Sequence, residues 1–171
     1  VIRRHNIKKI KEINDNGINY VLIPIINIPF ISTILFGKVL EKKFKDIFFD
    51  IVHFHSPLVP FVKLNSKKHI LTIHSTMKVD TSFINSISTH AILNKIMGKF
   101  LSPFFENQLI KKCDNVIIVC KDINNELINS YGYENLKTHY IPNGIDKNLF
   151  NNLNLRRKRQ ILYVGRLGYR K

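Results

Sequence analysis

Short apolar runs alternate with longer amphipathic stretches along most of the chain. Five runs bounded by turn residues predict strands. They are NYVLIPI from Asn19, DIVHF (Asp50–Phe54), HILTI (His69–Ile73), NVIIVC (Asn115–Cys120) and THYIP from Thr138. The continuous apolar run NVIIVC is typical of a strand that is buried on both faces of a parallel sheet.

Between these runs, apolar residues recur at spacings of three and four, which predicts helices. The pattern indicates a basic helix over Asn6–Asn14 that stops near Asn16-Gly17, and an amphipathic helix over Ser32–Phe48. A long helical region spans Ile84–Lys112, with a break near Ser102-Pro103 because proline interrupts a helix. A further helix is expected after Asp122 as its cap, with Gly132 at its end.

Strands that alternate with helices indicate an α/β fold with a doubly wound, Rossmann-like parallel sheet. Ligands of such sheets bind beyond the carboxyl ends of the strands. Five polar candidates lie at or just past predicted strand ends: His55, Ser56, His74, Cys120 and Asn143. We therefore expect the functional residues to gather at one edge of the sheet.

The composition changes after the fifth predicted strand. An Asn-rich segment leads into the basic run RRKR at Arg156–Arg159, which is typical of a linker, and ILYV then starts a new strand. The expected organisation is one domain over residues 1–147, followed over 148–171 by a linker and the start of a second domain. Because the chain opens inside a predicted helix without a methionine, we expect that the first domain continues upstream of Val1.

The chain is strongly basic, with 27 Lys and Arg against 12 Asp and Glu and a net charge of +15. This charge favours anionic partners such as phosphates, acidic lipid surfaces or nucleic acid. The abundance of Lys, Asn and Ile leaves a compositional bias as an equally good explanation. The lysines of the second predicted helix are a candidate membrane face, or equally the solvated face of a core helix. They are Lys38, Lys42, Lys43 and Lys45.

Several classes of chemistry find little support. Cys113 and Cys120 match neither a disulfide framework nor a C-x-x-C metal pair, and reduced thiols indicate a cytosolic setting. His53 and His55 share one face of a strand, but no further ligand follows, so no metal site is expected and His53 should have a local hydrogen-bond partner. Neither a Ser–His–Asp order nor a pair of catalytic carboxylates can be identified.

Two segments carry candidate binding chemistry. His74 ends an apolar strand and precedes Ser75-Thr76, where a small polar group can face a substrate. The closing segment ILYVGRLGYRK places Gly165 directly after a strand, followed by Arg166 and Lys171. Backbone N–H groups with an Arg and a Lys suit a diphosphate, although the segment alone is equally typical of a basic chain end.

The ordered series DIVHFHSP, LTIHST, CDNVIIVCKDINNELINSYG, YIPNGIDKNLF and ILYVGRLGYRK resembles the family 4 glycosyltransferases. The resemblance covers nearly the whole chain from Asn16. It implies the GT-B architecture, in which two Rossmann-like domains face each other across a cleft. Within the family, GRLGYRK, HST and the long helical segment from Ile84 look most similar to the branch that glycosylates phosphatidylinositol.

The resemblance also implies roles for particular residues. Arg166 and Lys171, next to Gly165, would bind the donor diphosphate, and His74 would be the active-site histidine of the first domain. The loop His55, Ser56 and Pro57 would lie near the acceptor. The PNGID segment would form the crossover between domains, through Asn143, Gly144 and Asp146.

The implied reaction is the retaining transfer of a sugar from a UDP- or GDP-sugar to an acceptor hydroxyl on a lipid or glycan. No metal or other cofactor is expected. The family's glycine-rich loop and its donor-side glutamate pair are absent from this sequence, so this chain alone is expected to be inactive. The implied location is cytoplasmic, with the cytoplasmic face of a membrane as a candidate surface. A catalytically incomplete or basic phosphate- or nucleic-acid-binding module is the alternative, although no nucleic-acid-binding motif is present.

Overall fold

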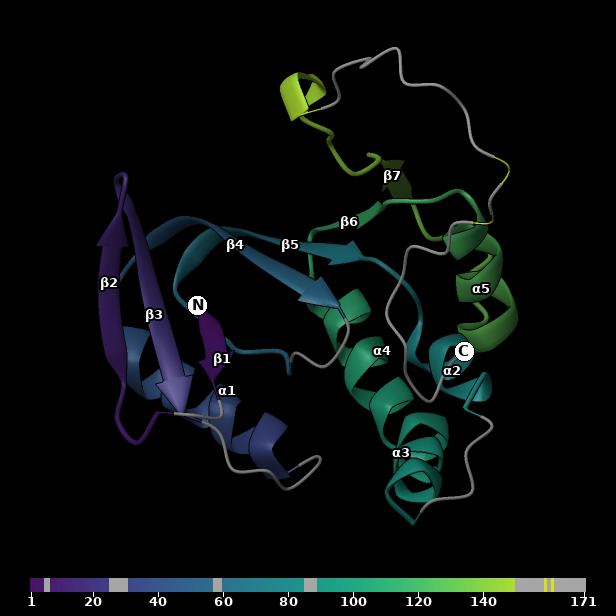
Figure 1. Ribbon diagram of the computed structural model, residues 1–171, viewed down its shortest axis with the longest axis horizontal. Coiled ribbons are helices and arrows are strands. Elements are labelled where there is room, and N and C mark those ends of the chain that lie inside the picture. The colour runs from purple at the N-terminus through teal and green to yellow at the C-terminus, as the bar shows by residue number, and fades with distance from the viewer. Residues whose placement is uncertain are drawn as a thin grey trace.

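The computed structural model describes residues 1–4, 7–24, 31–56, 60–84, 89–149, 159 and 161. Its centre is a parallel sheet of four strands in the order β4-β5-β6-β7 (Figure 1). The strands are β4 (Phe49–Ser56), β5 (Ser66–Ile73), β6 (Asn115–Ile118) and β7 (Thr138–Tyr140). This arrangement confirms the predicted α/β class with a Rossmann-like parallel sheet.

One face of this sheet forms the core with three helices. They are α1 (Ile31–Phe44), α4 (Ser102–Lys112) and α5 (Asp122–Tyr131). On the strands, Phe54, Leu71 and Ile73 are buried in this cluster. The helices contribute residues at helical spacing: Phe36, Leu40, Leu109, Ile110, Ile123 and Leu127. The left-handed backbone of Gly132, with φ of 71°, ends α5 as predicted.

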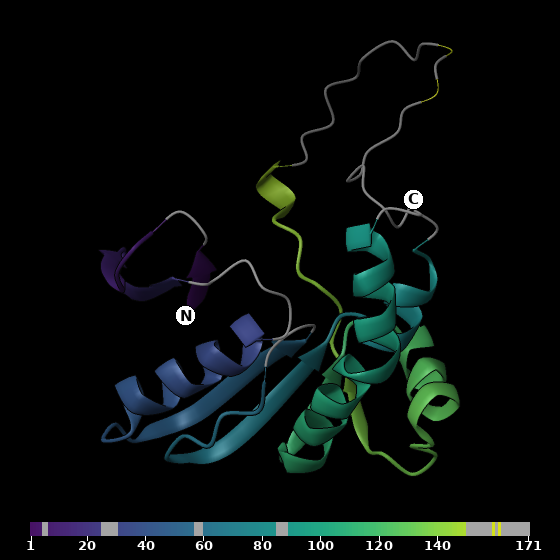
Figure 2. The same ribbon diagram turned by 90° about the horizontal axis from the view of Figure 1, so that it is seen from below.

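A second, smaller sheet was not predicted. It has the order β1-β3-β2, with β1 (Ile2–Arg4) parallel and β2 (Lys11–Asp15) antiparallel to β3 (Ile18–Pro24). Figure 2 shows α1 between this sheet and the four-stranded sheet. The predicted NYVLIPI strand is thus present as β3, but it belongs to a separate mixed sheet.

The helix predicted over Asn6–Asn14 is wrong, because its second half is strand β2. The residues that were interpreted as its stop signal form the turn of a hairpin instead. Asn16 and Gly17 both have positive φ, of 49° and 81°, between the paired residues Asp15 and Ile18. Asn-Gly is the preferred sequence for such a two-residue turn, whose twist matches the flanking strands.

Other boundaries also differ from the prediction. Strand β5 begins at Ser66 rather than His69, and β6 ends at Ile118 rather than Cys120. Helix α1 ends at Phe44 rather than Phe48, and Phe48 is exposed. Strand β4 continues through His55 and Ser56, which were expected in a loop, because both pair with β5. Asp122 is the first residue of α5 and not its cap: the N-cap is Lys121, without a side-chain capping bond.

The described residues between 77 and 112 form three helices. Helix α2 (Met77–Ser82), which was not predicted, precedes α3 (Thr89–Phe100), and only Leu101 separates α3 from α4. The predicted break near Ser102-Pro103 is therefore confirmed. In Figure 1, α3 extends α4 away from the sheet, so the two helices form one bent rod.

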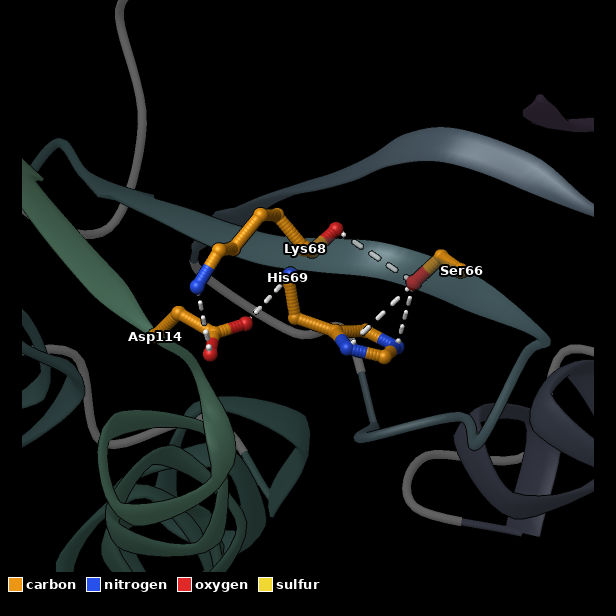
Figure 3. Close-up of polar contacts among 4 residues, drawn as sticks. All are labelled: Ser66, Lys68, His69 and Asp114. Carbon is orange, nitrogen blue, oxygen red and sulfur yellow. Dashed lines mark hydrogen bonds and ion pairs between the residues drawn. The ribbon is translucent and has the colours of Figure 1, made fainter.

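Asp114 fixes the start of β6 beside the middle of β5 (Figure 3). Its backbone N–H donates to the His69 carbonyl at 2.8 Å, and its Oδ2 accepts the His69 N–H at 2.8 Å. Mainly through that bond, and also through Lys68, the pKa of Asp114 is lowered. Asp114 thus fixes the register of β6 against β5, which places the opposite strand ends side by side.

Gly98 allows α3 to pack closely against α2. A Cβ added there would overlap the buried side chain of Thr81, whose hydroxyl donates to the Met77 carbonyl at 2.7 Å. We expect Gly98→Ala to lower the free energy of unfolding by about 1–3 kcal/mol, because the overlap cannot be relieved by a flexible chain end. Thermal or denaturant unfolding measures the change. Gly144→Ala is the control, since its added Cβ meets no atom within 4 Å, and an equal loss in both variants would contradict the prediction.

Candidate active site

His55 and His74 lie together at the carboxyl ends of two adjacent parallel strands. His55 is near the end of β4, opposite Thr72 of β5, and His74 directly follows β5. The two rings stack with their centroids 5.6 Å apart, and His55 Nδ1 lies 3.3 Å from His74 Nε2. Both residues are exposed. The sequence predicted each histidine at this edge, and the structure brings them into contact.

His53 continues the histidine cluster along β4. Its ring centroid lies 4.3 Å from that of His55, and its Nε2 is 2.7 Å from the Thr72 hydroxyl. The local hydrogen-bond partner predicted for His53 is thereby confirmed. Partial burial, followed by the nearby histidines, lowers the pKa of both His53 and His55. These rings are therefore mainly neutral at pH 7, so that each offers one N–H donor and one acceptor nitrogen.

Ser56 points to the opposite face of the sheet from His55, because successive side chains alternate along a strand. Its hydroxyl is buried and donates to Glu106 Oε1 at 2.7 Å. A direct contact with an acceptor stays a prediction for His55, whereas the Ser56 hydroxyl is already used inside the domain. Pro57 lies outside the described residues.

Glu106 of α4 is a buried carboxylate, 3% exposed, that joins the ends of three elements. Besides the Ser56 hydroxyl, it accepts the Met77 backbone N–H at 2.9 Å and the Tyr131 hydroxyl. Burial raises the pKa of Glu106, and the three donors oppose that shift. Burial, followed by the charge of Glu106, also raises the pKa of Tyr131.

A second carboxylate supports the segment that follows His74. Glu126 Oε2 of α5 accepts both the backbone N–H of Thr76, at 3.0 Å, and the Thr76 hydroxyl, at 2.8 Å. Thr76 is fully buried, and the charge of Glu126 contributes to the raised pKa of Glu106. Glu126 thus holds Thr76 and Glu106 holds the adjacent Met77, so two acids anchor the segment that follows His74.

Sequence reasoning missed this pair of carboxylates, having found no paired acids. A signal was present for Glu106: with Leu109, Ile110 and Cys113 it has the i, i+3, i+4, i+7 spacing of the core face of α4. An acid at a core position requires hydrogen-bond partners. Its partners lie 25 to 50 residues away in sequence, so no local pattern could name them.

The remaining predicted residues lie elsewhere. Asn143, Gly144 and Asp146 belong to an exposed segment after β7, where Asp146 Oδ1 accepts the Asn148 N–H at 2.9 Å. Cys120 is exposed, with its Sγ 3.6 Å from Asp122 Oδ2. Gly165, Arg166 and Lys171 lie outside the described residues. The contact of the crossover and the diphosphate-binding residues with a ligand stays a prediction.

The described part of the chain contains neither a metal-binding cluster nor a membrane-spanning helix. No group of three or more His, Cys, Asp or Glu there is arranged to hold a metal ion. None of the helices in that part is long and apolar enough to cross a bilayer.

The site therefore consists of histidine hydrogen-bonding groups at the carboxyl edge of a parallel sheet, supported by the buried Glu106 and the half-buried Glu126. Comparison with known protein families shows that the sequence model of Glycosyltransferase Family 4 matches residues 4–149 of the chain. The chain belongs to glycosyltransferase family 4. The matched region contains the whole four-stranded sheet, both histidines and both carboxylates. No curated protein and no solved structure matches the chain.

Membership in family 4 supports a role in glycosyl transfer and agrees with a Rossmann-like GT-B domain. In the family 4 domain, the His55–His74 pair lies where open α/β sheets bind their ligands. Imidazole nitrogens at this edge can hydrogen-bond sugar hydroxyls or phosphate oxygens.

Proposed function

We propose that the protein transfers a sugar from a nucleotide diphosphate sugar to an acceptor hydroxyl, with retention at the anomeric carbon. The donor is a UDP- or GDP-hexose, and the acceptor is a lipid or a glycan, with phosphatidylinositol as the first candidate. The observation that carries the proposal is the contact between His55 and His74, at 3.3 Å, at the carboxyl edge of a family 4 domain.

In this proposal His74 positions the donor. Its ring is exposed and, within the described part of the chain, its hydrogen-bond partner is His55, so that the other ring nitrogen can turn to a sugar hydroxyl or a phosphate oxygen. His55, one strand away, lies on the acceptor side. Glu106 and Glu126 do not touch substrate: they are positioning residues that hold the β4 end and the loop after β5.

The departing diphosphate gains negative charge while the sugar becomes cationic, and stabilising both is the main electrostatic task. The acceptor hydroxyl attacks the anomeric carbon, the bond from that carbon to the diphosphate oxygen breaks, and the proton of the hydroxyl leaves with the diphosphate. Arg166 and Lys171 are assigned to the diphosphate. Exclusion of water by closure of the cleft prevents hydrolysis of the donor.

A transfer assay on the protein expressed from its complete gene tests the proposal. UDP- and GDP-hexoses are offered with phosphatidylinositol vesicles, and both nucleoside diphosphate release and the anomeric configuration of the product are measured. We expect His74→Ala to lower kcat/KM about 10-fold, the effect of losing one hydrogen bond to the transition state. An inverted product, or no transfer from either donor, would contradict the proposal.

His139→Ala is the matched control. His139 is also an exposed histidine of the sheet, but it belongs to β7, two strands away from β5. We expect this variant to keep the activity of the unmodified protein. Equal losses in both variants would show that histidine removal acts through general instability and would remove His74 from the site.

A further inference from the structure

Four large apolar side chains form an exposed row along the rod of α3 and α4. They recur at a spacing of four residues and are Ile92, Ile96, Phe100 and Phe104, exposed by 47%, 51%, 66% and 59%. Residues four apart lie on the same side of a helix, and only Leu101 interrupts the rod. We call these four residues the α3 stripe.

The packing of α3 explains why the stripe faces outward. Gly98 is buried against Thr81 of α2, so that side of α3 is occupied. At 100° per residue, Ile92, Ile96 and Phe100 lie roughly 120° to 200° around the helix from Gly98. Ile92, Ile96 and Phe100 are thus turned away from α2, and they belong to α3, which extends the rod beyond the sheet (Figure 1).

The charged side chains around the α3 stripe are all positive. From Phe83 to Phe105 the sequence contains Lys95 and Lys99 and no Asp or Glu. The ammonium of Lys99 lies 5.6 Å from the centre of the Phe100 ring, and Lys95 donates to the Ile84 carbonyl at 3.1 Å. Lysines beside an exposed aromatic and aliphatic row are the composition of helices that lie in the membrane interface.

We propose that the α3 stripe is a docking surface for an anionic lipid bilayer. The four apolar side chains enter the boundary between headgroups and acyl chains, and Lys99 reaches the headgroup phosphates. A net charge of +15 favours an anionic surface and opposes pairing of the stripe with a second copy of this chain. Bilayer docking requires no sugar donor, so it stands or falls independently of the proposed transfer.

This assignment replaces the lysine-rich helix that the sequence suggested as the membrane face. On α1, Lys43 forms an ion pair with Glu12 of β2, and Glu41 lies on the same helix. Just after α1, Lys45 pairs with Asp46 at 3.6 Å. These acids reduce the attraction of that face for anionic lipid, and the α3 region has none.

Vesicle co-sedimentation of the chain tests the proposal. Vesicles of equal parts phosphatidylcholine and phosphatidylglycerol are compared with vesicles of phosphatidylcholine alone. We expect stronger binding to the anionic vesicles, and we expect Ile96→Ser with Phe100→Ser to weaken it on the order of 10²-fold, because two apolar side chains no longer enter the bilayer. Lys99→Gln should weaken binding about 5-fold.

The chain offers a closely matched control. Ile47 and Phe48 are the same two residue types, exposed by 46% and 56%, but lie beyond the end of α1. The double variant Ile47→Ser with Phe48→Ser should bind vesicles as the unmodified chain does, and Lys45→Gln is the corresponding control for charge. Circular dichroism checks that every variant keeps its fold.

Two outcomes would overturn the proposal. One is equal loss of binding in the α3 and the Ile47–Phe48 variants, or no loss in either. The other is a dimer in solution that only the α3 variant converts to a monomer while its vesicle binding is unchanged, which would assign the stripe to self-association.

Discussion

Replacing Glu106 with alanine is expected to lower the free energy of unfolding by about 3–5 kcal/mol, one of the largest effects of any single substitution in this domain. The reason is that the carboxylate accepts three donors from different elements: the Ser56 hydroxyl, the Met77 N–H and the Tyr131 hydroxyl. Ser56 and Met77 are themselves buried, so water cannot easily replace the lost acceptor. Denaturant unfolding monitored by circular dichroism measures the loss.

Glu106→Gln is the matched variant, because it keeps the shape and much of the bonding. The Gln carbonyl at the Oε2 position accepts from Met77 and Tyr131, and its amide at the Oε1 position donates to the Ser56 hydroxyl, which can accept. We expect it to cost at most about 1.5 kcal/mol. A loss below about 1 kcal/mol for Glu106→Ala would contradict the buried network.

The difference in folding stability between Glu106→Gln and the unmodified protein is expected to depend on pH. The pKa of Glu106 is raised in the folded state, so between the unfolded and folded pKa values the folded protein holds a proton that the unfolded chain has lost. Raising the pH through this window therefore lowers the stability of the unmodified protein. Gln cannot titrate. The stability of Glu106→Gln relative to the unmodified protein should rise over that window and be constant on either side.

The four-stranded sheet could be predicted because each strand carries its own signal. The runs around Phe54, Leu71 and Val116 are apolar over a strand's length, and all three residues are buried. Gly132 likewise marks the end of α5 by its own lack of a side chain. Where local pattern and tertiary environment agree, sequence reading succeeds.

The failures occurred where pairing partners decided the structure. Ile7, Ile10 and Ile13 recur at a spacing of three, which suggested a helix, but Ile13 pairs across the hairpin with Tyr20. The Asn16-Gly17 turn was visible in the sequence and could have indicated the hairpin. Helix α2 is only six residues long, too short to leave a periodic pattern.

The candidate site, like the fold, could be predicted only in part from the sequence. His55 and His74 could be placed at one edge because each follows or ends its own strand, and parallel strands align their carboxyl ends. Their 3.3 Å contact could not be predicted, since it depends on the register of β4 against β5. The two acids that support the site, Glu106 and Glu126, come from α4 and α5, and they come together only in the folded domain.

Arg166→Ala and Lys171→Ala are each expected to lower kcat for sugar transfer on the order of 10²-fold or more in the protein expressed from its complete gene. Both residues lie outside the described part of the chain, and the expectation rests on the GRLGYRK segment and the proposed reaction. Negative charge on the diphosphate increases as the bond to the sugar breaks. A cation at that position is therefore worth more in the transition state than in the bound donor, and its loss affects kcat more than KM.

A conservative replacement of Arg166 separates its charge from its hydrogen-bonding geometry. Arg166→Lys keeps the charge but loses the two-pronged bond to phosphate, so an intermediate loss of about 10-fold is expected. Arg156→Ala and Arg157→Ala remove a cation from the nearby basic run and are the controls for net charge. If they reduce kcat as strongly as Arg166→Ala, the effect is one of overall charge, and the assignment of the diphosphate to Arg166 and Lys171 is wrong. If only KM rises, the two cations bind the donor without stabilising its departure.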